Sequence, residues 1–163
     1  MTMPKTPPVL TPLLGPVLRD HGVPEPWQFG MADRVRFHEL DALNHVNNAV
    51  YLSWFESLRV AYLAEYGVYD YVPGEPLLVM RAVGVTYHAP LHLGETYITT
   101  GRTVVLGRTS FQMEYGVFVE GRLRAEGHAA IVLMDADGKT GVPLSAEQRA
   151  IFTARDGAQP HQA

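Results

Sequence analysis

The stretch NAVYLSWFESLRVAYLAEY, residues 48–66, places apolar side chains at the spacing of an α-helix. Two overlapping series, three or four residues apart, run through it: Val50, Trp54, Leu58, Ala61 and Tyr51, Phe55, Leu58, Tyr62. Because apolar residues fall on nearly every side, this helix must be buried on most sides, and a sheet must curve around it. Asn47 is in position to cap its start, and Gly67 stands where a left-handed glycine commonly ends a helix.

The segments on either side of this helix have the alternation and turn signals of strands. A first strand is predicted before the helix, and a meander of four strands after the loop Pro73–Pro76, at Ala32–Phe37, Leu77–Tyr87, Glu95–Leu106, Thr109–Glu120 and Leu123–Asp135. Ser145 is expected to cap a short terminal helix, Ser145–Thr153. One strand, one long helix and an antiparallel meander indicate an α+β fold, with about five strands wrapped around the central helix.

The two ends of the chain differ from this central domain, which we place at residues 27–155. Seven of the 12 prolines precede Trp27, so residues 1–26 cannot hold a long helix or a central strand. We predict a proline-rich arm there, with part of it lying against the body. Residues 156–163 are polar and are predicted to form a disordered tail.

Composition excludes several classes of function. The chain has 163 residues, which suits a single domain, and no cysteine, which excludes disulfides, thiolate catalysis and cysteine-ligated metal sites. A net charge of −4 without a basic cluster argues against nucleic acid as a partner. The sequence has no run of about eighteen apolar residues for a membrane span and no signal-peptide pattern, so we expect a cytoplasmic protein.

The residues that carry chemistry lie directly before the long helix, in RFHELDALNHVNNAVYL, residues 36–52. A helix start offers unpaired N–H groups and the positive end of the helix dipole. A carboxylate a few residues upstream, Asp41, can face the same point. This pairing suits attack on a carbonyl, because the carboxylate activates water or attacks directly while the amides hold the oxyanion.

The same residues resemble the D…HVNN…YL…FE signature of the 4-hydroxybenzoyl-CoA thioesterase family of hotdog-fold proteins, which is related to acyl-CoA and acyl-carrier-protein thioesterases. The segments that carry the resemblance are Phe37–Asp41, His45–Leu52 and Trp54–Glu56. Tyr87–Pro90 with Gly94–Glu95 is similar to the family's Y-x-x-P…G-[DE] turn. The resemblance covers about residues 32–143 and implies a hotdog fold and hydrolysis of an acyl-CoA, with a fatty-acyl or aryl-acyl group.

The resemblance also implies roles for individual residues. Asp41 is the expected catalytic carboxylate, the backbone N–H of Asn48 the oxyanion donor, and His45 a supporting group. Substrate contacts are expected from two places, the helix start and a tight turn where CoA phosphates cross a subunit boundary in resembling proteins: Asn44, Val46, Asn47 and Tyr51, then Arg108, Thr109 and Ser110. No cofactor is expected besides the CoA of the substrate. His88 and His92 have Pro90 between them in a turn, so no metal site is predicted.

Several alternatives stay open on the sequence alone. Asp41 could simply cap a turn, as loop aspartates commonly do, and His45 could pack rather than orient a catalytic group. Carrier-protein thioesterases show D-x-N-x-H at this point, whereas this chain has Leu43 in place of the asparagine. The substrate could be an acyl carrier protein instead of CoA, or the fold could bind an acyl ligand without cleaving it. The presence of Asp41 argues against the last of these.

The small number of predicted elements also bears on the quaternary structure. A thin sheet on one apolar helix leaves a sheet edge and much of a face uncovered, so we expect a homodimer or a homotetramer. On the helix, Glu56 and Arg59 are three residues apart and are expected to form a structural ion pair.

Overall fold

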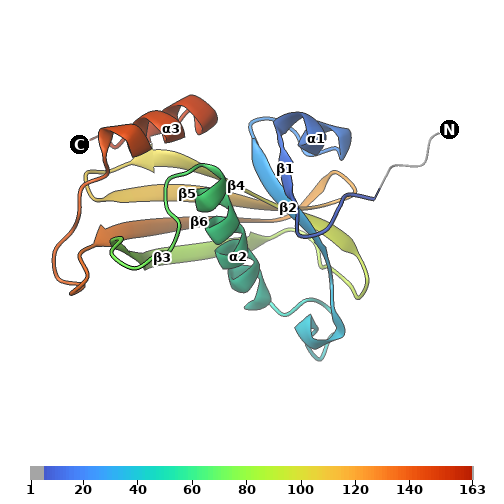
Figure 1. The fold of residues 1–163 in the computed structure, drawn as a ribbon. Helices are drawn as coiled ribbons and strands as arrows, with labels where there is room; N and C mark the ends of the chain where they lie inside the picture. The colour runs from blue at the N-terminus through green and yellow to red at the C-terminus, as the bar shows by residue number, and fades with distance from the viewer. Residues whose placement is uncertain (1–5, 163) are drawn as a thin grey trace.

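The computed structural model describes residues 6–162 and shows one curved sheet with one long helix lying across it (Figure 1). The first five residues of the predicted arm and Ala163 of the predicted tail lie outside the described residues. The elements in chain order are β1 (Pro12–Leu14), α1 (Gly15–Asp20), β2 (Phe29–Arg34), η1 (Phe37–Glu39), α2 (Val50–Glu65), β3 (Leu77–Tyr87), β4 (Thr96–Leu106), β5 (Ser110–Val119), β6 (Arg122–Met134), α3 (Ala146–Asp156) and β7 (Gln159–Pro160).

The sheet has seven strands in the order β1-β2-β4-β5-β6-β3, with β7 beside β4. All pairs are antiparallel except β4 with β7. The predicted α+β hotdog architecture is confirmed, and the bounds of β3 to β6 agree with the prediction to within one residue. The two strands beyond the expected five are short: β1 comes from the proline-rich arm and β7 from the C-terminal tail.

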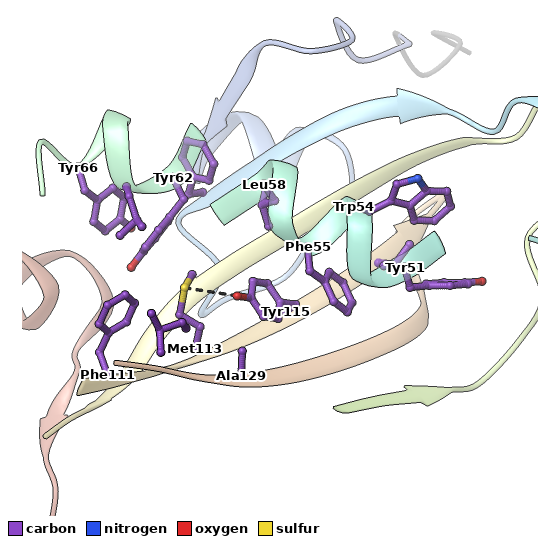
Figure 2. Close-up of a cluster of buried hydrophobic side chains, with 14 of the residues drawn as sticks. Tyr51, Trp54, Phe55, Leu58, Tyr62, Tyr66, Phe111, Met113, Tyr115 and Ala129 are labelled. Carbon is purple, nitrogen blue, oxygen red and sulfur yellow. Dashed lines mark hydrogen bonds between the residues drawn. The ribbon is translucent and has the colours of Figure 1, made fainter. Parts of the chain in front are cut away.

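Helix α2 packs its aromatic residues onto the concave face of the sheet (Figure 2). The ring of Phe55 stacks on Tyr115 with centroids 4.6 Å apart, and Trp54 stacks on Tyr97 at 3.9 Å. Glycines let the helix approach closely, since a Cβ built on Gly127 would lie 2.5 Å from the Phe55 ring. Close packing of this kind leaves no room between Phe55 and strands β5 and β6.

The start of α2 differs from the prediction, whereas its end agrees. The helix begins at Val50 with Ala49 as N-cap, rather than at Asn48 with Asn47 as N-cap. The reason is a turn that precedes it: the Asn47 carbonyl accepts from the N–H of Val50 at 2.9 Å, and the Asn47 side chain accepts from Ala49 at 2.9 Å. At the other end Gly67 has a φ of +64°, as expected of a glycine that ends a helix.

The first long strand, β2, begins and ends three residues earlier than the predicted Ala32–Phe37. Strand β2 begins earlier because Leu14 of β1 pairs with Phe29. It ends earlier because Phe37–Glu39 forms a short 3-10 helix. The local alternation of apolar and polar residues indicates neither the pairing of β1 with β2 nor the 3-10 helix.

The arm behaves as a structural part of the domain. Its residues form only short elements, β1 and α1, as the prolines require. Leu13 and Leu18 are buried against Ile98 and Phe118, on the face of the sheet that points away from α2. Strand β1 therefore covers one edge of the sheet, and β3 forms the other.

The C-terminal tail was predicted to be disordered, but the structure packs it onto the body. The side chain of Asp156 is buried and accepts hydrogen bonds from the hydroxyls of Tyr62 and Tyr66 and from the N–H of Thr103. Burial raises the pKa of Asp156 above its ordinary value. Beyond it, β7 pairs with β4, and the His161 N–H donates to Leu106 at 2.8 Å. The polar tail is ordered because its polar groups find partners on distant elements, which its composition does not reveal.

Among residues 6–162, no helix combines the length and apolarity needed to span a bilayer.

Candidate active site

The loop before α2 is a small hairpin that places Asp41 and His45 side by side. Leu40 bridges to Val46, and the Asp41 N–H donates to the His45 carbonyl at 2.8 Å. Asn44 closes the turn with a φ of +59°, a left-handed conformation that asparagine tolerates better than most residues. Asn44, predicted to contact substrate, thus has a clear structural role in shaping this hairpin.

The carboxylate of Asp41 is only partly used by the hairpin. Its Oδ1 accepts the N–H groups of Leu43 at 2.8 Å and His45 at 3.3 Å, so Asp41 does cap a turn. Its Oδ2 accepts no hydrogen bond from any residue between 6 and 162, and the side chain is partly exposed. One oxygen therefore anchors the carboxylate while the other stays available to water or a substrate.

Unpaired amides lie at the entry to α2. In the part of the chain that the structure describes, the N–H groups of Val50, Ala49 and Leu52 all have acceptors, while those of Asn48 and Tyr51 have none. Asn48 is exposed, whereas Tyr51 is only 2% exposed. The N–H of Asn48 is thus an unpaired donor on an exposed residue, and it precedes the helix by two residues.

The imidazole of His45 packs against a second histidine from the loop between β3 and β4. The rings of His45 and His92 meet edge to face, with centroids 5.1 Å apart and planes at 85°. The two loops are also joined through the backbone, because the Val46 N–H donates to the Leu91 carbonyl at 2.9 Å. The Glu95 carboxylate accepts from the backbone N–H of His92 at 2.7 Å.

Two tyrosines form an aromatic wall beside Asn48. The ring of Tyr51 lies 5.1 Å from that of Tyr87, and the Tyr87 hydroxyl donates to the Asn48 carbonyl at 2.6 Å. Burial, followed by the nearby Tyr87 and Glu95, raises the pKa of Tyr51 to about 12. Tyr51 therefore stays protonated at neutral pH and cannot serve as a base.

The remaining predicted residues divide between the hairpin and the far end of the sheet. Val46 is buried in the core, and Asn47 caps the turn before α2. Arg108, Thr109 and Ser110 lie at the opposite end of β4 from Asp41. An 11-residue strand spans about 36 Å. Within one chain these three residues are not brought to the Asp41 hairpin.

Open space lies beside α2 rather than beneath it. A cavity of about 360 Å³ runs between the helix and β2, and Ser53, Ser57, Trp54 and Tyr97 are among the residues that line it. Its volume lies within the usual range for small-molecule pockets. A larger cavity of about 780 Å³ lies on the other face of the sheet, where Asp20, Glu95 and Glu120 give it an acidic lining that would repel CoA phosphates.

Sequence reasoning did not identify His92 and Glu95 as part of this site. The family resemblance includes the turn that contains them, through Tyr87–Pro90 and Gly94–Glu95, but the sequence offers His92 only as a potential metal ligand. No local pattern indicates that its ring meets His45. No cluster of three or more potential metal ligands is found between residues 6 and 162, and the absence of a metal stays a prediction.

Comparisons with known proteins show which family the chain belongs to. A family model described as the thioesterase-like superfamily matches residues 35–152. A crystal structure of a thioesterase superfamily protein from Jannaschia sp. CCS1 is 43% identical, with a TM-score of 0.91 over 95% of this chain and 99% of that chain. A thioesterase from Thermus thermophilus, complexed with coenzyme A and Zn, is 34% identical, with a TM-score of 0.70 over 80% of this chain and 95% of that chain.

More distant structures share the fold, including a DHNA-CoA thioesterase from Staphylococcus aureus, 18% identical with a TM-score of 0.70 over 77% of this chain and 88% of that chain. None of the curated proteins compared with the chain matches it. The predicted resemblance to hotdog-fold thioesterases is confirmed. Since the matched segment, residues 35–152, spans most of the domain and contains the Asp41 hairpin, the chain belongs to the thioesterase-like superfamily.

Proposed function

We propose that this protein hydrolyses an acyl-CoA thioester, with a fatty-acyl or aryl-acyl group, to the free acid and CoA. The observation that carries the proposal is the Asp41 hairpin, which leaves one carboxylate oxygen without a hydrogen-bond donor among the described residues and leads into the turn where the Asn48 N–H is unpaired. Thioester hydrolysis is the activity class that the family supports. The CoA-bound thioesterase from Thermus thermophilus supports CoA as the carrier.

Two reaction courses fit this geometry. In one, Asp41 takes a proton from water as the resulting hydroxide attacks the thioester carbonyl. In the other, Asp41 attacks directly, forming a mixed anhydride that water then opens. In both, negative charge develops on the carbonyl oxygen, the Asn48 N–H stabilises it, and collapse of the tetrahedral species expels the CoA thiolate. His45, next to Asp41 in the hairpin, is a supporting group in either course.

We also propose that the protein forms a dimer through β3. This 11-residue strand is a sheet edge, and it exposes Val79, Met80, Val83 and Tyr87. A long apolar edge of this kind pairs readily with another strand. In an antiparallel pair of two β3 strands, one sheet is reversed relative to the other. The Arg108 turn of one subunit then lies at the same end as the Asp41 hairpin of its partner, which supports the proposed binding of CoA phosphates by Arg108, Thr109 and Ser110.

We expect a single substitution on β3 to separate the subunits. Val83→Lys places a charge on the proposed interface, so light scattering at micromolar concentration should change from twice 18.0 kDa to 18.0 kDa. Val17→Lys is the matched control, because Val17 has nearly the same exposure, 41% against 40%, and lies on α1 at the far side of the sheet. A wild-type protein that is an active monomer would contradict the proposed dimer and the shared CoA site.

The proposed activity is tested by following the release of free CoA with a thiol reagent. The panel should contain short, long and aryl acyl-CoAs, because the cavity beside α2 does not by itself select among them. The chain has no cysteine, so the reagent reports only the product. A parallel set of acyl-carrier-protein thioesters distinguishes the carrier. Hydrolysis of the carrier-protein set alone would overturn CoA as the carrier, and tight binding of acyl-CoA without release would indicate a binding protein.

A further inference from the structure

The imidazole of His45 is held by packing and not by hydrogen bonds. Neither of its ring nitrogens is bonded to a residue between 6 and 162, and the side chain is partly exposed. Its backbone, by contrast, is fixed in the hairpin by two contacts with Asp41. If the ring nitrogens are to remain available to a substrate, packing contacts rather than hydrogen bonds must fix the orientation of the ring. In this structure the ring that meets it is His92.

His92 is itself well anchored, although its side chain is 53% exposed. The Glu95 carboxylate accepts from the backbone N–H of His92 at 2.7 Å and lies 3.5 Å from the Nδ1 of the His92 ring. Glu95 is in turn 3.8 Å from the guanidinium of Arg124, which donates to the Pro90 carbonyl at 3.0 Å. The loop between β3 and β4 is thereby tied to β6, which lies between β5 and the edge strand β3. An exposed histidine without such contacts would sample several rotamers.

We infer that His92 is a positioning residue that holds the His45 ring in its working orientation through edge-to-face contact. This inference rests on the proposed function, since it gives His45 a supporting role beside Asp41. Edge-to-face geometry is favourable for two rings and restricts the rotation of both. Glu95 and Arg124 act on the His45 ring indirectly, because they hold His92 in place. The hairpin and the loop between β3 and β4 thus form one preorganised unit.

The kinetic test compares kcat and KM of variants that either lack or keep an aromatic ring at residue 92. His92→Ala removes the ring but keeps the backbone bond to Glu95, so the loop should remain folded. We expect kcat to fall about ten-fold with KM within about two-fold, because the loss is one of orientation. His92→Phe keeps an aromatic edge and face and should restore kcat to within about two-fold of wild type. If alanine and phenylalanine variants are equally slow, or if only KM changes, the positioning role is wrong.

A double-mutant cycle separates positioning from a general structural effect. If His92 acts through His45, then adding His92→Ala to His45→Ala should cost nothing further in kcat. Additive losses would overturn the inference. Asp41→Asn serves as the reference for the reaction itself, because unchanged hydrolysis in that variant would contradict the proposed function independently of residue 92.

NMR tests the contact without any substrate. With ¹³C-labelled histidine, the ring protons of His45 should carry a ring-current shift from His92, and their resonances can be assigned by comparison with His45→Gln. We expect the shift to disappear in His92→Ala and to persist in His92→Phe. A His45 spectrum that is identical in wild type and His92→Ala would overturn the inference whatever the enzyme hydrolyses.

Discussion

Asp41→Asn is expected to slow acyl-CoA hydrolysis at least a hundred-fold while leaving the fold intact, since loss of a general base costs about 10²–10⁴ in rate. The amide oxygen of asparagine can still accept the N–H groups of Leu43 and His45 that Asp41 now binds. The hairpin should therefore persist. What the amide cannot do is take a proton from water or attack a thioester. The measurement is kcat/KM from CoA release, with melting curves of both proteins.

Asp135→Asn provides a matched control. Asp135 also caps a turn with one carboxylate oxygen, which accepts the N–H groups of Lys139 and Thr140 at 3.0 and 3.3 Å. Within its own subunit it follows β6, at the end of the sheet opposite the Asp41 hairpin. If Asp41 were only a turn cap, the two variants would behave alike, with rates within a few-fold of wild type. That result would remove Asp41 from the chemistry.

Asn48→Pro is expected to lower kcat by about 10²–10³, because it deletes the N–H assigned to the oxyanion. The structure gives a reason for the backbone to accept proline. The Val50 N–H donates to the Asn47 carbonyl across a four-residue turn, in which Asn48 is the second residue. Proline is favoured at that position, and Asn48 has no positive φ. The Asn48 carbonyl, which accepts from the Tyr87 hydroxyl, remains in place.

Asn48→Ala is the companion variant, since it keeps the N–H and removes the side chain. It should stay within about ten-fold of wild type if the backbone carries the effect. Matched melting curves are needed for both variants, so that a loss of fold is not mistaken for a loss of the donor. Equal activity of the proline and alanine variants would place the oxyanion at another amide, with the unpaired N–H of Tyr51 the next to examine.

Local patterns in the sequence were sufficient for the parts of the molecule that obey local rules. The apolar period of residues 48–66 predicted α2, and the alternation of residues 77–135 predicted β3 to β6 nearly to the residue. Both signals arise within a few neighbouring residues, because the side-chain spacing of a helix or strand is a property of that segment alone. The motif around Asp41 likewise led to the thioesterase family, since its residues lie close together in the chain.

The structure differed from the prediction wherever a segment depends on a distant partner. Helix α2 starts at Val50 because Asn47 forms a turn directly before it, and the composition of this segment does not indicate that turn. Residues 156–162 are ordered because Asp156 finds Tyr62 and Tyr66, some ninety residues earlier. For polar segments, order or disorder is decided by whether such partners exist, and a local reading of composition cannot supply that information.

The candidate site shows the same division at the level of single residues. Asp41 was identified from its position before a helix, the family resemblance implied the roles of His45 and Asn48, and all three lie in one hairpin and the turn that follows it. The contact of His92 with His45, and the separation of Arg108 from Asp41 by the length of β4, became visible only in three dimensions. Spacing along the chain specifies which groups share a loop. Which loops meet is set by the packing of the sheet, whose strand pairs join residues far apart in sequence.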